Sequence, residues 1–188
     1  MSPARLAVFA DASVLYSALL RDMLVQAALE KAFTLRWSAE VQAEWRRALL
    51  ANRPDLEEAK IARTQSLMET ALPTATVEGF HARIGELTLP DPNDRHVLAA
   101  AIHSGCHIVA TFNLSDFPAS VLAPYNIAAL HPDTFFAQVL EDAPSPFIAA
   151  LRTVRSRLKA PSYSIDEFLL LLLRHRLDVT AEALRPML

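Results

Sequence analysis

Short apolar runs alternate with segments of helical spacing along most of this chain. The runs cover residues 5–10, 34–37, 74–77, 107–111 and 126–130 and consist mainly of apolar or β-branched residues. Strands of a parallel sheet are typically continuous apolar runs, because helices cover both faces of the sheet. Strands that alternate with helices form βαβ units. The sequence therefore predicts an α/β fold around a parallel sheet.

The helix expected between the third and fourth strands has clear ends. Asp91 suits the N-cap position, Pro92 the first helical position and Gly105 the C-cap. Other helices are expected from about Ser13 to residue 33, from Ser38 to residue 50 and over residues 55–72.

The composition shifts at Pro144 and Pro146, and beyond them we expect helices only. These cover residues 147–158, 164–176 and a short stretch after Thr180, and Ser164 to Glu167 forms a capping box. Residues 1–143 carry 11 basic against 17 acidic side chains, and residues 144–188 carry 7 against 4. We predict a domain over residues 1–142 and a C-terminal helical extension over 143–188.

Composition excludes several classes of protein. With 52% hydrophobic residues the chain is no disordered segment, and three glycines cannot build a glycine-rich phosphate loop. A single cysteine, Cys106, allows neither an internal disulfide nor a cysteine-based zinc site, and we expect it to be a small buried residue of a cytoplasmic protein. The apolar run 168–173 is too short to span a membrane. We expect it to be buried within the protein, with a dimer or partner contact as the alternative.

Acidic side chains cluster where the predicted strands end. Asp11 ends the first strand, Asn113 and Asp116 follow the fourth, and Asp94 opens a helix. Ligands of parallel α/β sheets bind outside the carboxyl ends of the strands. Glu44, on the helix after the second strand, can join them.

Carboxylates that face one crevice repel one another, and a divalent cation removes that conflict. Oxygen ligands favour Mg²⁺ or Mn²⁺ over zinc. Such an ion lowers the pKa of a bound water and neutralises charge on phosphoryl oxygens, which suits phosphodiester hydrolysis.

Four short segments in this order resemble the PIN-domain ribonucleases. They are residues 8–15 around Asp11, 38–45 with Glu44, 91–101 with Asp94, and 110–117 with Asn113 and Asp116. Residues 127–136 are similar to the last strand and helix of that family. The resemblance covers about residues 4–142. It implies a three-layer α/β/α domain and a Mg²⁺- or Mn²⁺-dependent endoribonuclease.

The chain looks like the longer VapC-like toxins of type II toxin–antitoxin pairs, which carry a helical C-terminal addition. An antitoxin partner, an RNA substrate and paired nuclease domains follow from that likeness. Asp11 and Asp94 would hold the principal ion, and Glu44 and Asp116 would complete the site. Ser13 would orient Asp11. The family often has an aspartate where this chain has Asn113, so either Asp116 replaces it or Asn113 positions a water or a phosphate.

Other interpretations stay open at several positions. Glu40 competes with Glu44, Asp91 suits a cap better than a ligand, and Asp116 could cap a loop. The histidines His96, His103 and His107 are interpreted as structural or surface residues. Arg95 could touch an RNA phosphate, with surface ion pairing as the alternative. Four further basic residues could contact RNA in a salt-sensitive way, with a solvated helix face as the alternative: Arg152, Arg155, Arg157 and Lys159.

Two other functions compete with the toxin. One is a non-catalytic RNA-binding or scaffold module with a decayed site, and the other is a housekeeping PIN nuclease. A phosphatase of the haloacid dehalogenase type needs an Asp-x-Asp motif after its first strand. Here Ser13 occupies the second acidic position, so the pair of acids that such an enzyme needs is absent.

Overall fold

The computed structural model describes residues 6–158 and 163–187, and its core is a parallel sheet of five strands in the order β3-β2-β1-β4-β5. The strands are β1 (Ala7–Ala10), β2 (Thr34–Ser38), β3 (Thr76–Val77), β4 (Ile108–Ala110) and β5 (Ala128–Leu130). The predicted parallel α/β sheet is confirmed. Residue 5, where we expected the first strand to begin, lies outside the described residues.

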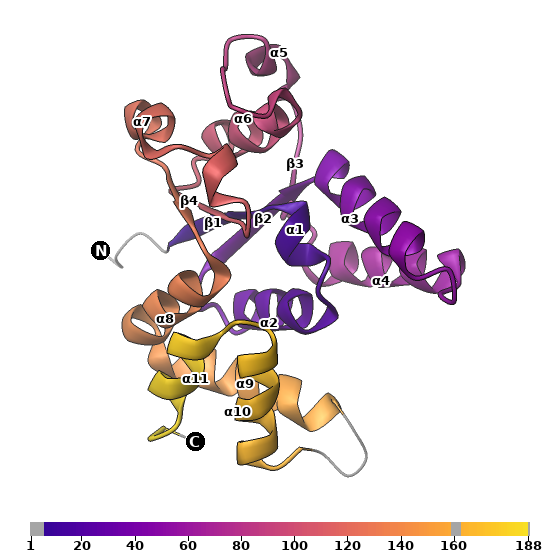
Figure 1. Ribbon diagram of the computed structural model, residues 1–188, viewed down its shortest axis with the longest axis vertical. Coiled ribbons are helices and arrows are strands. Elements are labelled where there is room, and N and C mark those ends of the chain that lie inside the picture. The colour runs from indigo at the N-terminus through magenta and orange to yellow at the C-terminus, as the bar shows by residue number, and fades with distance from the viewer. Residues whose placement is uncertain (1–5, 159–162, 188) are drawn as a thin grey trace.

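Helices cover both faces of the sheet in a three-layer arrangement (Figure 1). The helices that follow β1 and β2 are α1 (Ala12–Leu15), α2 (Ala18–Leu29), α3 (Ala39–Asn52) and α4 (Glu58–Ala71). Those that follow β3 and β4 are α5 (His81–Ile84), α6 (Arg95–His103) and α7 (Ala119–Leu122). Figure 1 shows α6 and α7 on one side of the sheet and α2 on the other.

The strand order reverses its direction of growth between β1 and β4. From β1 the chain passes outward to β2 and β3, then crosses back to β4 and β5. Ala10 and Ala110 are register partners there, so both strands end at the same level. A reversal of this kind opens a crevice at the carboxyl ends of the strands. The fold therefore brings the residues after Ala10 next to those after Ala110.

Local signals explain the well-predicted ends of α6. Asp91 accepts a hydrogen bond from the Asn93 amide at 2.8 Å and caps a single 3-10 turn, η1 (Pro92–Asp94), which continues into α6. Gly105 has φ +67° at the other end, and the Cys106 amide returns to the Ala101 carbonyl. A glycine accepts this left-handed conformation without steric cost. Cys106 is buried, as predicted.

The last four helices are α8 (Pro132–Asp142), α9 (Pro144–Arg157), α10 (Ile165–Arg174) and α11 (Asp178–Leu184). Of these, α9 packs against α2 and α8, and α11 packs against α8 and α10. The capping box of α10 is confirmed by hydrogen bonds in both directions between Ser164 and Glu167. The expected burial of the whole run 168–173 is wrong. Leu170 and Leu173 are 55% and 38% exposed, because one helix face is enough to cover the neighbouring helices.

The last helix begins at Asp178, two residues before Thr180, although we expected it to start only after Thr180. Its amides at Val179 and Thr180 donate to the carboxylate of Asp133, at 2.9 and 2.8 Å. The Thr180 hydroxyl donates to the same carboxylate at 2.7 Å. Asp133 lies in the first turn of α8 and is buried, so a residue distant in sequence caps α11. The capping carboxylate is not local, so residues 177–180 alone could not show it.

Short elements that the sequence did not indicate close two loops. They are α5, α7 and two 3-10 turns, η2 (Leu114–Asp116) and η3 (Ala123–Tyr125). Within residues 6–158 and 163–187, no helix has the length and apolar character needed to cross a membrane.

Candidate active site

The Asp11 carboxylate is fixed at the junction of β1 and β4 by three donors. The Ala12 amide donates to Oδ1 at 2.7 Å, and the hydroxyls of Ser13 and Thr111 donate to Oδ2 at 2.6 and 2.8 Å. Asp11 is only 5% exposed. Charge-assisted hydrogen bonds of this kind compensate the cost of burying an ionised carboxylate and hold its orientation.

Both hydroxyls are held in turn by the loop after β4. Ser13 Oγ accepts from the Phe112 amide at 3.1 Å, and Thr111 Oγ1 accepts from the Asn113 amide at 2.9 Å. Each hydroxyl proton is thereby left to point at Asp11. The hydrogen bond from Ser13 to Asp11, which the resemblance implied, is present. Thr111 was missed, because a threonine at the end of the expected strand 107–111 gives no sign that its hydroxyl faces Asp11.

Asp94 lies at the junction of η1 and α6 and meets other acids there. Burial first, and then the negative charges of Asp11, Asp91 and Asp116, raise the pKa of its carboxyl group to about 6. His96 acts in the opposite direction. Asp11, Asp94 and Asp116 therefore share one negative field. Asp91 belongs to that field as well as capping η1.

This field predicts an unusual pH dependence of the metal-free protein. A raised carboxyl pKa means that the folded state binds more protons than the unfolded state between 3.8 and about 6. The contribution of Asp94 to stability must then fall as the pH rises through that window. We expect Asp94→Asn to melt above the wild type by a margin that widens from pH 4 to pH 7. Thermal melts of both proteins in chelator measure this margin, and a constant margin would contradict the coupling.

Glu44 reaches the same region from α3 through a histidine. Its Oε1 lies 2.8 Å from Nε2 of His96, which is two residues beyond Asp94 on α6. Burial alone would lower the pKa of His96, but the hydrogen bond and charge of Glu44, together with neighbouring carboxylates, raise it overall. The rival acid, Glu40, pairs with the exposed His81 at 2.5 Å. Sequence analysis treated His96 as structural and did not connect it with Glu44.

Asp11 lies where β1 and β4 end, and its charge and that of Asp116 act on Asp94. Two families match the chain. The PIN domain family matches residues 7–115.

The chain belongs to the PIN-domain family.

The match includes three of the predicted acids, Asp11, Glu44 and Asp94. It also includes Asn113, and Asp116 lies just after its end. Residues 132–186 match the VapC50 C-terminal domain, which accounts for α8 to α11. A segment of 79 residues is 38% identical to a Mycobacterium tuberculosis protein named "Putative ribonuclease VapC50". That segment is 40% of this chain and 47% of the relative, so about half of the relative is matched. No solved structure matches the chain.

The PIN domain has the donor chemistry for a hard cation but no ready-made coordination shell. Within the described ranges, no group of three or more His, Cys, Asp or Glu side chains is close enough to hold a metal ion. The negative charges of Asp11, Asp91 and Asp116 nevertheless act together on Asp94, and with burial, the largest cause, they raise the pKa of its carboxyl group. Oxygen donors in a negative field fit Mg²⁺ or Mn²⁺. An ion would have to draw these side chains closer together.

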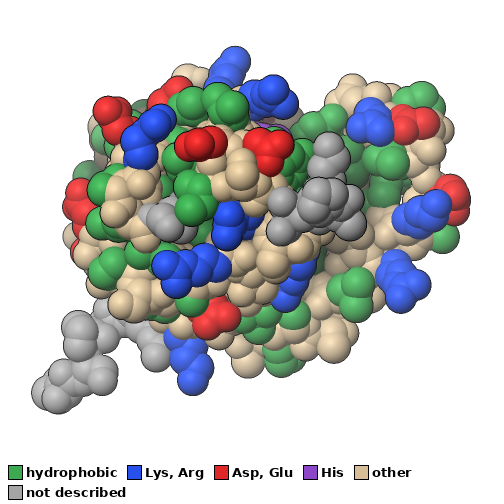
Figure 2. All heavy atoms as spheres, turned by 90° about the horizontal axis from the view of Figure 1, so that it is seen from below, with side chains coloured by type: hydrophobic (Ala, Val, Ile, Leu, Met, Phe, Trp, Pro, Cys, Tyr) green, Lys and Arg blue, Asp and Glu red, His purple; other side chains and the backbone are tan. Residues whose placement is uncertain are grey.

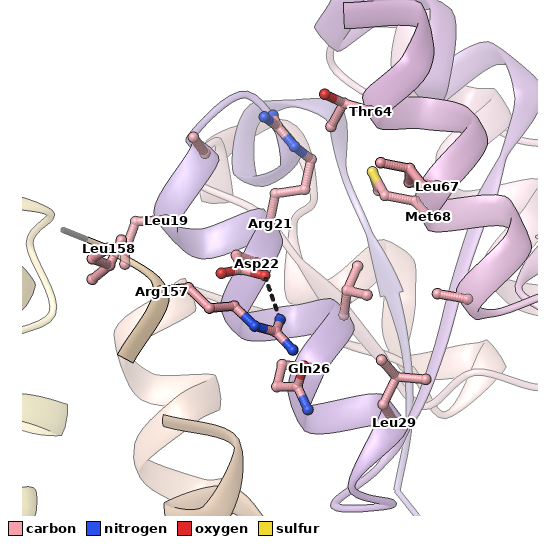
Figure 3. Close-up of a pocket in the computed structure, with 13 residues that line it drawn as sticks. Leu19, Arg21, Asp22, Gln26, Leu29, Thr64, Leu67, Met68, Arg157 and Leu158 are labelled. Atoms are coloured by element: carbon pink, nitrogen blue, oxygen red, sulfur yellow. Dashed lines mark ion pairs between the residues drawn. The ribbon is translucent and has the colours of Figure 1, made fainter. Parts of the chain in front are cut away.

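The basic residues considered for RNA do not form one patch with the acids. Arg157 pairs with Asp22 of α2 at 3.8 Å (Figure 3), and Arg155 donates to the Tyr163 carbonyl. Arg152 is exposed on α9, and Lys159 lies outside the described residues. In Figure 2, Lys and Arg side chains are scattered among acidic and apolar ones on the face seen from below. Arg95 is half-buried beside Asp94.

Two hollows of about 520 and 620 Å³ lie along α2 and α4. The first is the apolar groove of Figure 3, with Leu29, Leu67 and Met68 in its wall. The second includes Tyr16, Leu56 and His175, and Arg21 lines both. None of Asp11, Glu44, Asp94 and Asp116 lines either hollow, so the candidate chemistry lies outside both.

Proposed function

We propose that this chain is a Mg²⁺- or Mn²⁺-dependent endoribonuclease that hydrolyses RNA phosphodiester bonds and acts as the toxin of a toxin–antitoxin pair. One observation carries the proposal: acids from three separate elements share a negative field at the point where the strand order reverses. Membership of the PIN-domain family and the likeness to a protein named as a ribonuclease support the same activity.

Asp11 and Asp94 would hold the ion, and Glu44 and Asp116 would complete the site. When bound, the ion supplies a nucleophilic water of lowered pKa and stabilises charge on the phosphoryl oxygens. The chain's own residues do the positioning. Ser13, Thr111 and the Ala12 amide fix Asp11, which lets that carboxylate bind without first losing rotamer freedom. Asp94 must be ionised to contribute, so binding should weaken below about pH 6.

Asn113 acts through its backbone in this proposal. Its amide holds Thr111 Oγ1, and its side chain is exposed at the edge where an RNA phosphate or a water would approach. Asp116, which belongs to the shared field, therefore takes the place of the acid that the family often has at position 113. An antitoxin protein would inhibit the toxin by covering the acidic edge, and the setting would be the cytoplasm.

Induced expression in a bacterial host tests the activity. We expect the wild type to arrest growth and to leave discrete fragments in total RNA, whereas Asp11→Ala does neither. The fragment ends would identify the target RNA. Fragments of equal yield from both proteins would contradict the proposed site, because cleavage would then not depend on Asp11.

A non-catalytic RNA-binding module is the second candidate. It is favoured by the lack of a three-ligand group among the described side chains. Such a module would shift RNA in a gel with and without Mn²⁺ and leave it uncut. Cleavage that needs added Mn²⁺ would exclude it.

A further inference from the structure

His96 joins two elements that meet at the acidic edge. It lies in the first turn of α6, two residues after Asp94, and contacts Glu44 in the middle of α3. The two helices come from distant parts of the sequence, and the contact of 2.8 Å between Nε2 and Oε1 links them. The His96 side chain is 12% exposed and that of Glu44 36% exposed. The imidazole is thus held by packing, while the glutamate carboxylate is accessible to solvent.

Glu44 needs such a contact to stay at this edge. Its side chain is long, and the carboxylates of Asp11 and Asp94 repel a further negative charge. Among the described groups that act on Asp94, His96 is the one that opposes the acids. A donor on the packed imidazole can therefore hold a carboxylate where neighbouring charges would push it away.

The two ring nitrogens of His96 have different surroundings, and these show which of them donates to Glu44. Nδ1 of His96 is buried and has no hydrogen-bond partner in the described part of the chain. The contact with Glu44 is made by the other nitrogen, and an ionised carboxylate oxygen can only accept a hydrogen bond, so Nε2 is the donor. The arrangement suits a proton on Nε2, donated to Glu44, and this tautomer is inferred from the contacts.

We infer that His96 is a positioning residue that holds the Glu44 carboxylate at the Asp11–Asp94 edge, so that Glu44 contributes to divalent-ion binding through this contact. The inference rests on the proposed metal-dependent function. It also selects Glu44 over Glu40, because the partner of Glu40, His81, is 63% exposed and lies on α5.

Two amide substitutions separate positioning from mere packing. Gln places its amide nitrogen near the position of Nε2 and can still donate to Glu44, whereas the shorter Asn cannot reach that position. We expect His96→Asn to weaken Mn²⁺ binding about ten- to hundredfold, as loss of a group that orients a ligand does. His96→Gln should retain most of the affinity. Calorimetric titration of the full chain with MnCl₂ measures both, and thermal melts confirm that each variant is folded.

A double-mutant cycle with Glu44→Gln gives the sharper result. If His96 acts through Glu44, His96→Asn causes no further loss of Mn²⁺ affinity once Glu44→Gln is present. The matched control is His81→Asn, which removes the other histidine–glutamate contact of α3 and should leave the affinity unchanged within twofold.

The inference is overturned if the two losses multiply in the double mutant, or if His96→Asn binds Mn²⁺ like the wild type. These outcomes leave the proposed function standing, since the wild type still binds the ion. A wild type that binds no Mn²⁺ overturns both. Should His96→Asn fail to fold, Glu44→Gln and His96→Gln decide. We expect Glu44→Gln to weaken Mn²⁺ binding and His96→Gln to retain it. Wild-type affinity in Glu44→Gln, or a lost affinity in His96→Gln, would overturn the inference.

Discussion

Asp11→Asn should reduce Mn²⁺-dependent RNA cleavage by about three orders of magnitude, the equivalent of several kcal/mol of transition-state stabilisation. The amide has the shape of the carboxylate but not its charge, so the ion loses its best-fixed ligand. It also cannot satisfy the three donors that meet at Asp11, because an amide nitrogen must face either the Ala12 amide or the two hydroxyls. Initial cleavage rates of purified proteins on a labelled RNA measure the loss.

The same substitution should leave the fold intact and relieve Asp94. With the charge of Asp11 removed, the pKa of the Asp94 carboxyl should fall from about 6 towards the ordinary value, which carbon-detected NMR titration can follow. Asp142→Asn is the matched control, because Asp142 is exposed at the end of α8. This variant should cleave RNA like the wild type. Cleavage by Asp11→Asn within a few-fold of wild type would show that Asp11 holds no essential ion.

Asp133→Ala should lower the free energy of unfolding by roughly 2–4 kcal/mol. The change removes the acceptor for two α11 amides and for the Thr180 hydroxyl, all at 2.7–2.9 Å. Thr180 is fully buried, so its donors would not regain water. Urea denaturation followed by circular dichroism measures the loss.

The control for this prediction is Asp142→Ala, on the exposed end of the same helix, which should change the free energy of unfolding by less than about 0.5 kcal/mol. Equal urea midpoints for Asp133→Ala and wild type would mean that the carboxylate does not stabilise α11. Such a result would leave apolar packing alone to hold the C-terminal helices against α8.

Features written in consecutive residues were predictable. The strand expected at residues 107–111 has an apolar centre, Ile108 to Ala110, and the end of α6 has a glycine where the backbone turns left-handed. Asp11 stood out because a carboxylate that interrupts an apolar run needs a reason. Parallel order then placed Asp11 and the residues after β4 at one edge, since the carboxyl ends of parallel strands coincide there.

Features that depend on a distant partner were not predictable. Thr111 looks like an ordinary strand residue until the register of β1 and β4 puts its hydroxyl on Asp11. Nothing in the sequence pairs His96 with Glu44, because the contact joins two helices, α6 and α3, that are far apart in the chain. The start of α11 depends on Asp133, 46 residues before Val179. Each is a tertiary contact, and local spacing carries no information about it.

Calorimetric titration of the wild-type chain with Mn²⁺ tests most directly whether the acidic edge takes a divalent ion. The account predicts saturable binding at low millimolar concentrations or below, which weakens as the pH falls below about 6 and is lost in Asp11→Asn. The absence of binding to the folded wild type at pH 7 would contradict it. The shared negative field at the ends of β1 and β4 would then belong to a surface that no longer holds a metal.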